Sequence, residues 1–248
     1  MSQPLVTDRD YRKIIIPRWV SQEIESFPKP SEEELKAQSR YNAPLIDEYM
    51  PAGKASAILE VGCGFGGFLF ALKERGYTNL TAIDLIPECC AFVHERIGIK
   101  AECVDVLTFL AEDEGRYDAI VALDVIEHFN KNEIVAIVER FYDALNPGGV
   151  FIMRVPNGGS ISGLSVRYSG FTHETAFTKG SIHELFKAMG FREVTCLPDP
   201  VYAKNPLKGA VKYAMRWTAE RIISFGTLLA IEPDFAVSKN VTGVGWKR

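Results

Sequence analysis

The middle of the chain alternates between short apolar runs and longer segments with helical spacing. The apolar runs are rich in Val, Ile and Leu and predict buried β-strands. We place these strands at 57–62, 80–85, 101–106, 118–124 and 149–155. The segments between them show the apolar spacing of helices, which we place at 66–76, 87–97, 107–113 and 131–145. Strands and helices that alternate in this way form a mostly parallel sheet with helices on both faces.

The regions on either side of this core follow other patterns. Residues 1–55 are polar and rich in proline, and we expect a helical N-terminal cap there. Its main helix should begin after Ser31, with Glu34 as the capping partner, and end near Met50. Residues 156–180 hold many Gly, Ser and Thr, which predicts a long loop of the kind that often carries function. The remaining expected elements are a helix at 181–189, a strand at 192–197, an insertion at 198–240 and a last strand at 241–246.

Length and composition are typical of one soluble, globular domain. The chain has 248 residues, of which 47% are hydrophobic and 24% are charged. This composition allows a sizeable core, and we divide the chain into the cap at 1–55 and a domain at 56–248. The net charge of −4 gives no general attraction to nucleic acid.

No segment of the sequence indicates secretion or a membrane span. The first residues lack the apolar core of a signal peptide, and no apolar run approaches the ~20 residues that a transmembrane helix needs. The 5 cysteines show neither the spacing of a metal site nor a dense disulfide pattern. We therefore expect a cytoplasmic protein.

The first strand of the core ends in a glycine-rich turn, Gly62-Cys63-Gly64-Phe65-Gly66-Gly67. A buried strand, a glycine turn and a helix bind a nucleotide-like cofactor in doubly wound domains. The glycines satisfy the G-x-G-x-x-G pattern, and Asp84 ends the second strand roughly 20 residues later, where a carboxylate can accept ribose hydroxyls. This spacing alone admits both a nicotinamide dinucleotide and S-adenosylmethionine.

Later segments separate the two cofactors. The third strand ends in Asp105, residues 118–124 begin and end with Asp, and an Asn-Pro-Gly-Gly turn at 146–149 precedes the fifth strand. In this order the segments resemble the motifs of class I S-adenosylmethionine-dependent methyltransferases over residues 56–157. The resemblance implies an α/β, Rossmann-like, doubly wound sheet of seven strands in the order 3-2-1-4-5-7-6. The last strand would be antiparallel, with insertions after strands 5 and 6.

The same resemblance implies how S-adenosylmethionine is bound. Asp84 would bind the ribose, Asp105 would face the adenine, and Glu60 would lie near the amino group of the methionine part. The full cofactor-binding set implied by the family comprises Tyr41, Glu60, Gly62, Cys63, Gly64, Asp84, Leu85, Asp105, Val106 and Asp124. A nicotinamide dehydrogenase and a non-catalytic cofactor-binding module remain the alternatives.

The choice of acceptor depends on the bases near the strand ends. A hydroxyl acceptor is a weak nucleophile while protonated, so it needs a base or a metal ion. His128, just past the fourth strand, and His173, inside the long loop, are the candidate bases. Asp124, Glu127 and His128 also form a D-x-x-E-H sequence, which resembles the E-x-x-E-H metal motif of quinone-biosynthesis O-methyltransferases. A divalent cation such as Mg²⁺ held by these three residues is therefore the alternative.

The segment 154–178 suggests the substrate. It resembles the substrate-side region of methyltransferases from bacterial surface-polysaccharide biosynthesis, which implies a sugar hydroxyl in a glycan as the acceptor. A quinone or another small molecule remains the alternative. The chain lacks a basic stripe interleaved with aromatics and a D/N-P-P-Y/F motif, so we do not expect nucleic acid as a partner. The candidate substrate residues are Arg154, Asn157, Arg167, Tyr168 and Glu174.

A basic, amphipathic segment lies late in the chain, at 204–229. Lys208, Lys212 and Arg216 recur every four residues and therefore share one helical face. Such a helix can lie on an anionic membrane surface, which would place the protein at the inner face of the membrane. It can equally pack on the core or on a second subunit of a homodimer, and we favour packing. The apolar residues of its other face are Leu207, Val211, Ala214, Met215, Ile222, Phe225 and Leu229.

Overall fold

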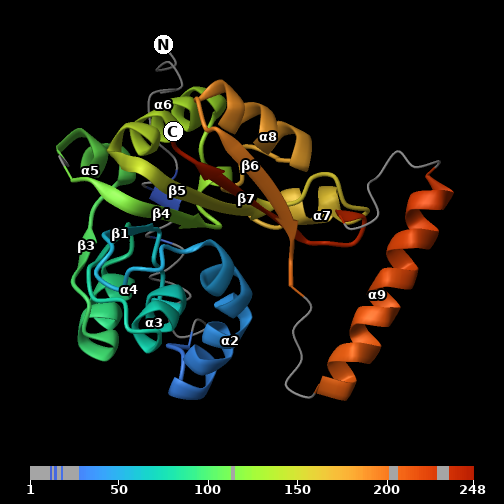
Figure 1. Cartoon of the computed structure of the whole chain (residues 1–248), viewed down its shortest axis with the longest axis horizontal. Coiled ribbons are helices and arrows are strands. Elements are labelled where there is room, and N and C mark those ends of the chain that lie inside the picture. The colour runs from blue at the N-terminus through green and yellow to red at the C-terminus, as the bar shows by residue number, and fades with distance from the viewer. Residues whose placement is uncertain are drawn as a thin grey trace, which may run out of the picture.

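The computed structural model describes residues 12, 14, 15, 18, 28–112, 115–200, 206–227 and 235–248. Its centre is a 7-stranded sheet with the order β3-β2-β1-β4-β5-β7-β6, as expected (Figure 1). β7 is antiparallel to both of its neighbours, and the other pairs within the sheet are parallel. The strands are β1 Ile58–Val61, β2 Leu80–Asp84, β3 Ala101–Cys103, β4 Tyr117–Leu123, β5 Leu145–Pro156, β6 Glu193–Pro198 and β7 Asn240–Trp246.

Helices cover both faces of the sheet, so its central strands are buried from both sides. Figure 1 shows α2, α3 and α4 on one face and α5, α6 and α8 on the other. Phe141, Phe151 and Phe186 belong to one hydrophobic core cluster, which includes side chains of β5. Ile46 of α2 and Phe68 of α3 belong to a second cluster, on the opposite face of the sheet. The helices are α2 Glu32–Tyr49, α3 Gly67–Glu74, α4 Pro87–Phe92, α5 Val106–Glu112, α6 Lys131–Ala144, α7 Gly163–Arg167, α8 Lys179–Ala188 and α9 Pro206–Gly226.

Local capping chemistry sets where several helices begin. The expected capping box at the start of α2 is present, because the Ser31 side chain accepts from Glu34 N and the Glu34 side chain accepts from Ser31 N. Asn130 and Glu133 form the same reciprocal pair at the start of α6. These short polar side chains satisfy backbone N–H groups that have no partner inside the helix.

Three expected elements differ in detail. The helix expected at 87–97 ends at Phe92 and continues as a π-helical turn, Val93–Ile97. The strand expected at 101–106 is shorter, since the chain leaves the sheet after Cys103 to start α5. The Asn-Pro-Gly-Gly segment at 146–149 lies inside β5, where the pairing with β4 jumps from Leu145 to Val150 and the extra residues bulge out of the ladder.

The late amphipathic helix is present as α9, outside the two helix layers (Figure 1). We expected its apolar face to pack, but that face does not pack on the core. Leu207, Val211, Met215, Ile222 and Phe225 are all more than half exposed. The predicted positions 204 and 229 lie outside the described residues. Among the helices that the structure describes, none is long and apolar enough to cross a membrane.

Candidate active site

A cavity of about 570 Å³ opens at the carboxyl ends of the parallel strands. In doubly wound sheets, ligands bind at this edge. The ends of β1 and β2 and the segment after β3 form one part of the wall, which we call the cofactor half. The turn after β4 and the loop 169–173 form the other part, which we call the acceptor half. The lining residues include Gly62, Gly64, Asp84, Leu85, Asp105, Val106, Asp124, Val125, His128, Phe129, Phe171, Thr172 and His173.

The glycine turn shapes the cofactor half. Gly62 and Gly64 both have positive φ, 69° and 51°, a region that residues with a Cβ seldom adopt. A Cβ at Gly62 would collide with Val125, whereas a Cβ at Gly64 would meet no atom within 4 Å. Gly64 therefore leaves space on the cavity side, where a ligand can approach the backbone closely.

Asp84 and Asp105 supply two carboxylates to the same wall. The Oδ2 atom of Asp84 accepts from Gly64 N at 2.7 Å, and its Oδ1 atom accepts from Ile86 N at 2.9 Å. Burial raises the pKa of Asp84, and the backbone donors of Gly64, Ile86 and Leu85 counteract this rise. Asp105 holds the start of α5 through Oδ1, which accepts from Leu107 N at 2.9 Å. Each carboxylate keeps further acceptor positions for hydroxyl or amine groups of a ligand.

Glu60 is a buried acid with an unsatisfied oxygen. The residue is 3% exposed, and its Oε2 atom has no hydrogen-bond partner. Burial, with the nearby Asp84 charge second, raises the pKa of Glu60 well above its usual value. A buried polar atom without a partner is costly, and a cationic ammonium group would satisfy it. Glu60 is not among the residues that line the cavity, so its pairing with the amino group of S-adenosylmethionine stays a prediction.

Two further residues of the expected cofactor set, Cys63 and Tyr41, do not line the cavity either. Cys63 is buried in a core cluster with Leu69 and Val93, and its thiol donates to the carbonyl of Gly64. The Tyr41 hydroxyl donates to Asp199 Oδ1 at 3.1 Å. Burial raises the pKa of Tyr41 to about 12. Direct contact of these two side chains with a cofactor stays a prediction.

Asp124 is held by an arginine rather than poised for a metal ion. It has a φ of 59°, which is rare for a residue other than glycine, and it lines the cavity just after β4. Both of its carboxylate oxygens accept from Arg154 on β5, with Nε at 3.2 and 3.1 Å and with a further contact from Nη2 to Oδ2. This carboxylate already has a cationic partner, and a metal ion held by Asp124, Glu127 and His128 stays a prediction.

The two candidate histidines meet in the acceptor half. The rings of His128 and His173 contact each other edge to face, with their centroids 5.0 Å apart. His128 Nδ1 lies 3.1 Å from the carbonyl oxygen of Thr172. A carbonyl only accepts hydrogen bonds, so Nδ1 carries the proton and Nε2 of the neutral ring has a free lone pair. Burial lowers the pKa of His128, which favours this neutral form near pH 7.

Glu127 is buried beside these histidines. It is 1% exposed, its Oε2 atom has no partner, and burial followed by the Asp124 charge raises its pKa to about 8. Its backbone carbonyl accepts from Glu174 N and Thr175 N at 2.8 and 3.0 Å, which ties the long loop to the turn after β4. One ligand atom from each of Glu127, His128 and His173 lies within 4.8 Å of the others. The structure thus gathers a possible ligand set that contains His173 in place of Asp124.

None of the five predicted substrate residues is among those that line the cavity, and two of them, Asn157 and Arg167, hold the loop together. Asn157 is 1% exposed, and its amide nitrogen donates to the carbonyls of Phe235 and Ser238. Arg167 donates to the carbonyls of His173 and Glu174. Tyr168 is 74% exposed, and Arg154 pairs with Asp124. A role of these five residues in substrate binding gains no support from the geometry.

Sequence reasoning missed the apolar part of the acceptor half. Phe129 follows His128 directly, and Phe171 precedes Thr172 in the loop, so both rings lie at the cavity next to the histidines. Arg12 lies 4.7 Å from the centre of the Phe129 ring and binds Glu133 through two nitrogens, at 3.0 and 2.6 Å. The position of Phe129 directly after a candidate base could have indicated that it lies at the cavity. Nothing in the sequence indicated the contact of Arg12, because Arg12 is far from Phe129 along the chain.

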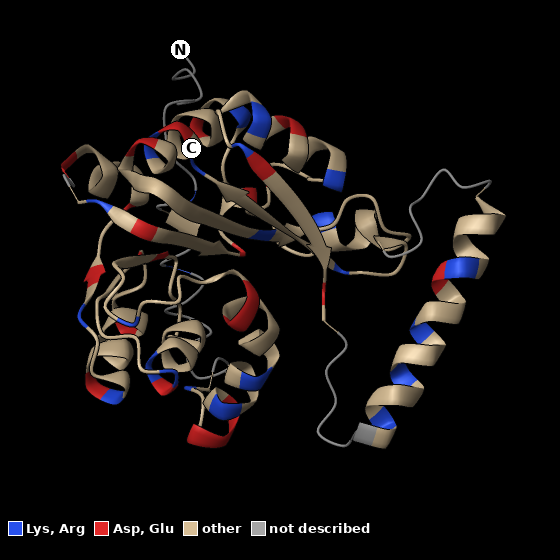
Figure 2. Cartoon of the chain, in the orientation of Figure 1, with Lys and Arg blue, Asp and Glu red and all other residues tan. Residues whose placement is uncertain are grey.

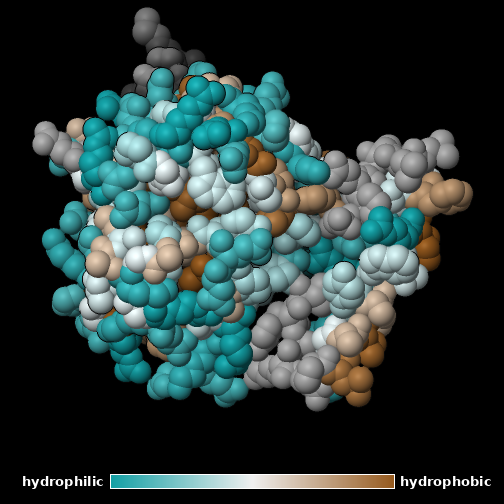
Figure 3. Space-filling view, viewed as in Figure 1, coloured by the Kyte–Doolittle hydropathy of each residue, from teal (hydrophilic) through white to brown (hydrophobic). Residues whose placement is uncertain are grey.

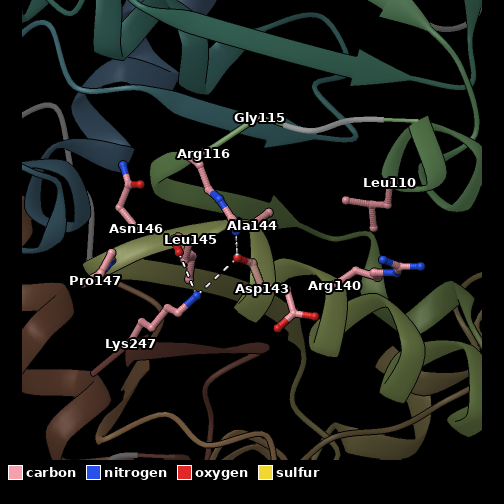
Figure 4. Close-up of a pocket in the computed structure, with 10 residues that line it drawn as sticks. All are labelled: Leu110, Gly115, Arg116, Arg140, Asp143, Ala144, Leu145, Asn146, Pro147 and Lys247. Atoms are coloured by element: carbon pink, nitrogen blue, oxygen red, sulfur yellow. Dashed lines mark hydrogen bonds between the residues drawn. The ribbon is translucent and has the colours of Figure 1, made fainter.

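A second, larger cavity has a structural explanation. It measures about 920 Å³ and is bordered by the start of β4, the end of α6 and the end of the chain (Figure 4). Lys247 Nζ donates to the carbonyls of Tyr142 and Leu145 at 2.6 and 2.8 Å, and Arg116 donates to that of Asp143. These cations satisfy carbonyls at the C-terminal end of α6, where positive charge is favourable.

The fold, with a glycine-lined cavity at the carboxyl ends of the strands, is that of solved S-adenosylmethionine-dependent methyltransferases. A solved S-adenosylmethionine-dependent methyltransferase from Archaeoglobus fulgidus has the same fold, with a TM-score of 0.64 at 18% identity, over 93% of this chain and 99% of that chain. A phosphoethanolamine N-methyltransferase of Haemonchus contortus, solved with S-adenosylhomocysteine, gives 0.57 at 17% identity, over 83% of this chain and 52% of that chain. At these identities the likeness concerns the fold alone.

The sequence places the chain more narrowly. Residues 34–196 match a family described as methyltransferase domain, and the chain belongs to this family. A tRNA N(3)-cytidine methyltransferase of Danio rerio is 28% identical over 193 residues, which are 63% of this chain and 50% of that relative. A ubiquinone biosynthesis O-methyltransferase of Xylella fastidiosa is 34% identical over 99 residues, which are 37% of this chain and 38% of that relative. The chain thus spans about half or less of these curated relatives.

Proposed function

We propose that the chain transfers a methyl group from S-adenosylmethionine to a hydroxyl group of a small molecule, with His128 as the general base. The observation that carries this proposal is the hydrogen bond between His128 Nδ1 and the Thr172 carbonyl oxygen, 3.1 Å long. Because Nδ1 donates its proton to this carbonyl, Nε2 is unprotonated and can accept a proton. His128 also lines the cavity, where an acceptor would bind.

The cofactor half would hold S-adenosylmethionine. When bound, this cofactor supplies an activated methyl group. Gly64 leaves room for its close approach, Asp84 and Asp105 would accept from its hydroxyl and amine groups, and the unsatisfied Oε2 of Glu60 would pair with its ammonium group. The family match supports this assignment, because the matched residues 34–196 include the whole cofactor half.

His128 would act on the acceptor. As the hydroxyl oxygen forms its bond to the methyl carbon, the hydroxyl proton passes to Nε2 of His128, and the bond between that carbon and sulfur breaks. An amine acceptor would need little assistance of this kind, so a neutral, oriented histidine favours O-methylation. Contact with His173 and the carbonyl of Thr172 restrict the movement of the His128 ring.

The wall of the acceptor half favours an aromatic hydroxyl, such as a phenol or quinol. Phe129, Phe171 and Val125 present apolar surface next to the two histidines, and Phe171 is 84% exposed. The sugar acceptor expected from the segment 154–178 has weaker support. A sugar needs several convergent polar groups, and the predicted substrate residues do not line this cavity.

A metal-assisted reaction is the second candidate. Its support is the cluster of Glu127, His128 and His173, in which Glu127 Oε2 and His173 Nδ1 have no hydrogen-bond partner. Two imidazoles and one carboxylate suit a transition metal such as Zn²⁺ better than Mg²⁺, which prefers oxygen ligands. If the metal is required, exhaustive chelation abolishes turnover and one metal restores it; full activity after chelation excludes this candidate.

One experiment tests the main proposal. The protein is incubated with S-adenosylmethionine and a panel of phenols, quinols, sugars, nucleotide sugars, amines and tRNA, and mass spectrometry detects any product that is one methyl group heavier. We expect methylation of an aromatic hydroxyl. Methylation of amines or tRNA alone would contradict O-methylation, and methylation of sugars alone would restore the sugar acceptor. Titration with S-adenosylmethionine and with NAD separates the methyltransferase from a dehydrogenase and from a module that binds neither.

A further inference from the structure

The helix α9 turns its polar side towards the rest of the protein. Glu220 and Ser224 are 5% and 1% exposed. Arg216 donates to Glu220 Oε1 at 2.7 Å and to the backbone carbonyl of Asp199 at 2.6 Å. These contacts fix which side of α9 faces the protein in the second half of the helix, whereas residues 210–215 are exposed on every side. The usual arrangement, in which the apolar side of a surface helix is buried, is therefore reversed here.

An apolar stripe runs along the opposite side of α9. At about 100° per residue, its five side chains fall within an arc of roughly 80°. Their exposed fractions lie between 53% and 78%, which is unusual for a set of large apolar residues on a single face. Figure 3 shows hydrophobic surface along the outer edge of this helix. The stripe comprises Leu207, Val211, Met215, Ile222 and Phe225.

Cations flank this stripe on both sides. Lys208 and Lys212 lie along one edge, and Arg221 lies along the other, 5.6 Å from the centre of the Trp217 ring. The three cationic residues are exposed, whereas Glu220, the acid of α9, is buried on the inner side. Figure 2 shows the same helix carrying mainly positive charge. The outward side of α9 is thus apolar in the middle and positive at its borders.

We propose that α9 docks in the plane of an anionic lipid bilayer, with the stripe among the acyl chains and Lys208, Lys212 and Arg221 at the headgroup phosphates. Helices with this distribution bind membrane surfaces through apolar burial and attraction to anionic lipids. α9 has 21 residues, but it is not apolar enough to cross a membrane, so the proposal places it in the interface. The proposal does not depend on the identity of the acceptor.

Charge complementarity favours a lipid surface over a second copy of the chain. A two-fold contact places the same surface of both copies against itself. The cations that border the stripe would then face cations of the partner, which disfavours association. Anionic headgroups present the opposite charge to the same three residues.

Vesicle flotation with the full chain tests this proposal. We expect the protein to float with vesicles of phosphatidylcholine and phosphatidylglycerol at about 50 mM salt, and to dissociate at about 500 mM. Vesicles of phosphatidylcholine alone should bind it at least about tenfold more weakly. Absence of flotation with the anionic vesicles would overturn the proposal.

Two pairs of substitutions, with matched controls on α6, locate the contact. Leu207→Ser with Phe225→Ser, and separately Lys208→Glu with Lys212→Glu, should lower vesicle binding at least about tenfold. Val135→Ser, and Lys131→Glu with Arg140→Glu, change exposed residues of α6 and should leave binding unchanged. Equal losses in the α6 controls would overturn the assignment to α9. A dimer that the α9 variants dissociate, without vesicle binding, would show that a second copy covers the stripe instead.

Discussion

The cofactor half and the acceptor half of the cavity are built in different ways. The cofactor half consists of strand ends and the turns that follow them, and its acids are fixed by backbone donors within one or two elements, as Asp84 is by Gly64 and Ile86. The acceptor half depends on contacts between segments far apart in the chain, such as His128 with Thr172 and Glu127 with Glu174. The sheet itself therefore determines the cofactor half. The acceptor half depends on a loop whose sequence can vary without altering the sheet.

The strongest test of this division is the substitution His128→Gln. We expect the turnover number to fall by about 10²- to 10⁴-fold, because the variant lacks a general base. The dissociation constant for S-adenosylmethionine should stay the same, since His128 belongs to the acceptor half. Steady-state kinetics and calorimetry measure the two quantities, and His94→Gln, at an exposed position on the π-helical turn, is the control. A parallel loss of cofactor affinity would mean that the halves are not separate.

The substitution Glu60→Gln should weaken cofactor binding, which His128→Gln should leave unchanged. We expect about 10- to 100-fold weaker binding of S-adenosylmethionine, because a charge-assisted hydrogen bond is lost. The free protein should remain folded, since burial already raises the pKa of Glu60 and the neutral amide has nearly the same shape. Calorimetry and thermal melting check both statements, with Glu102→Gln on β3 as the exposed control. Unchanged affinity would show that Glu60 does not contribute to cofactor binding.

A smaller effect concerns the stability of the acceptor half. Burial raises the pKa of Glu127 from 4.5 to about 8, so its contribution to stability is fully present below pH 4.5 and is lost as the pH rises through 8. Glu127→Gln does not titrate and should therefore become more stable than the natural protein as the pH increases. We expect its melting temperature to exceed that of the natural protein by about 5 °C at pH 8, and by much less at pH 5. A difference that is independent of pH would contradict the raised pKa.

The sheet and the cofactor half could be predicted because their signals are local. A short apolar run predicts a buried strand, the glycines of 62–67 allow positive φ, and an acid at a strand end needs no distant partner. The capping box of Ser31 and Glu34 is local in the same sense and is present in the structure. The order of the strands followed from the resemblance over residues 56–157, and the structure has that order.

The acceptor half could not be predicted in full, because its decisive contacts join residues distant in the sequence. The D-x-x-E-H sequence suggested that Asp124, Glu127 and His128 act together. In the structure, Arg154 from β5 holds Asp124, and His173 from the long loop takes the place beside Glu127. Helix α9 is a similar case, since periodicity gives the apolar side of a helix but not which side faces the protein.

The pH dependence of kcat/KM tests the role of His128 most directly. The measurement uses the best acceptor from the product screen, over a pH range that spans the ordinary histidine pKa of 6.5. Burial lowers the pKa of His128, so the free enzyme should keep more than half of its maximal kcat/KM at pH 6.5, and the fall of about tenfold per pH unit should lie below that pH. This acidic limb of the pH profile, in which kcat/KM falls as the pH is lowered, should be absent from the residual activity of His128→Gln. A limb centred at or above pH 6.5, or one that persists in this variant, would contradict the assignment of His128 as the base.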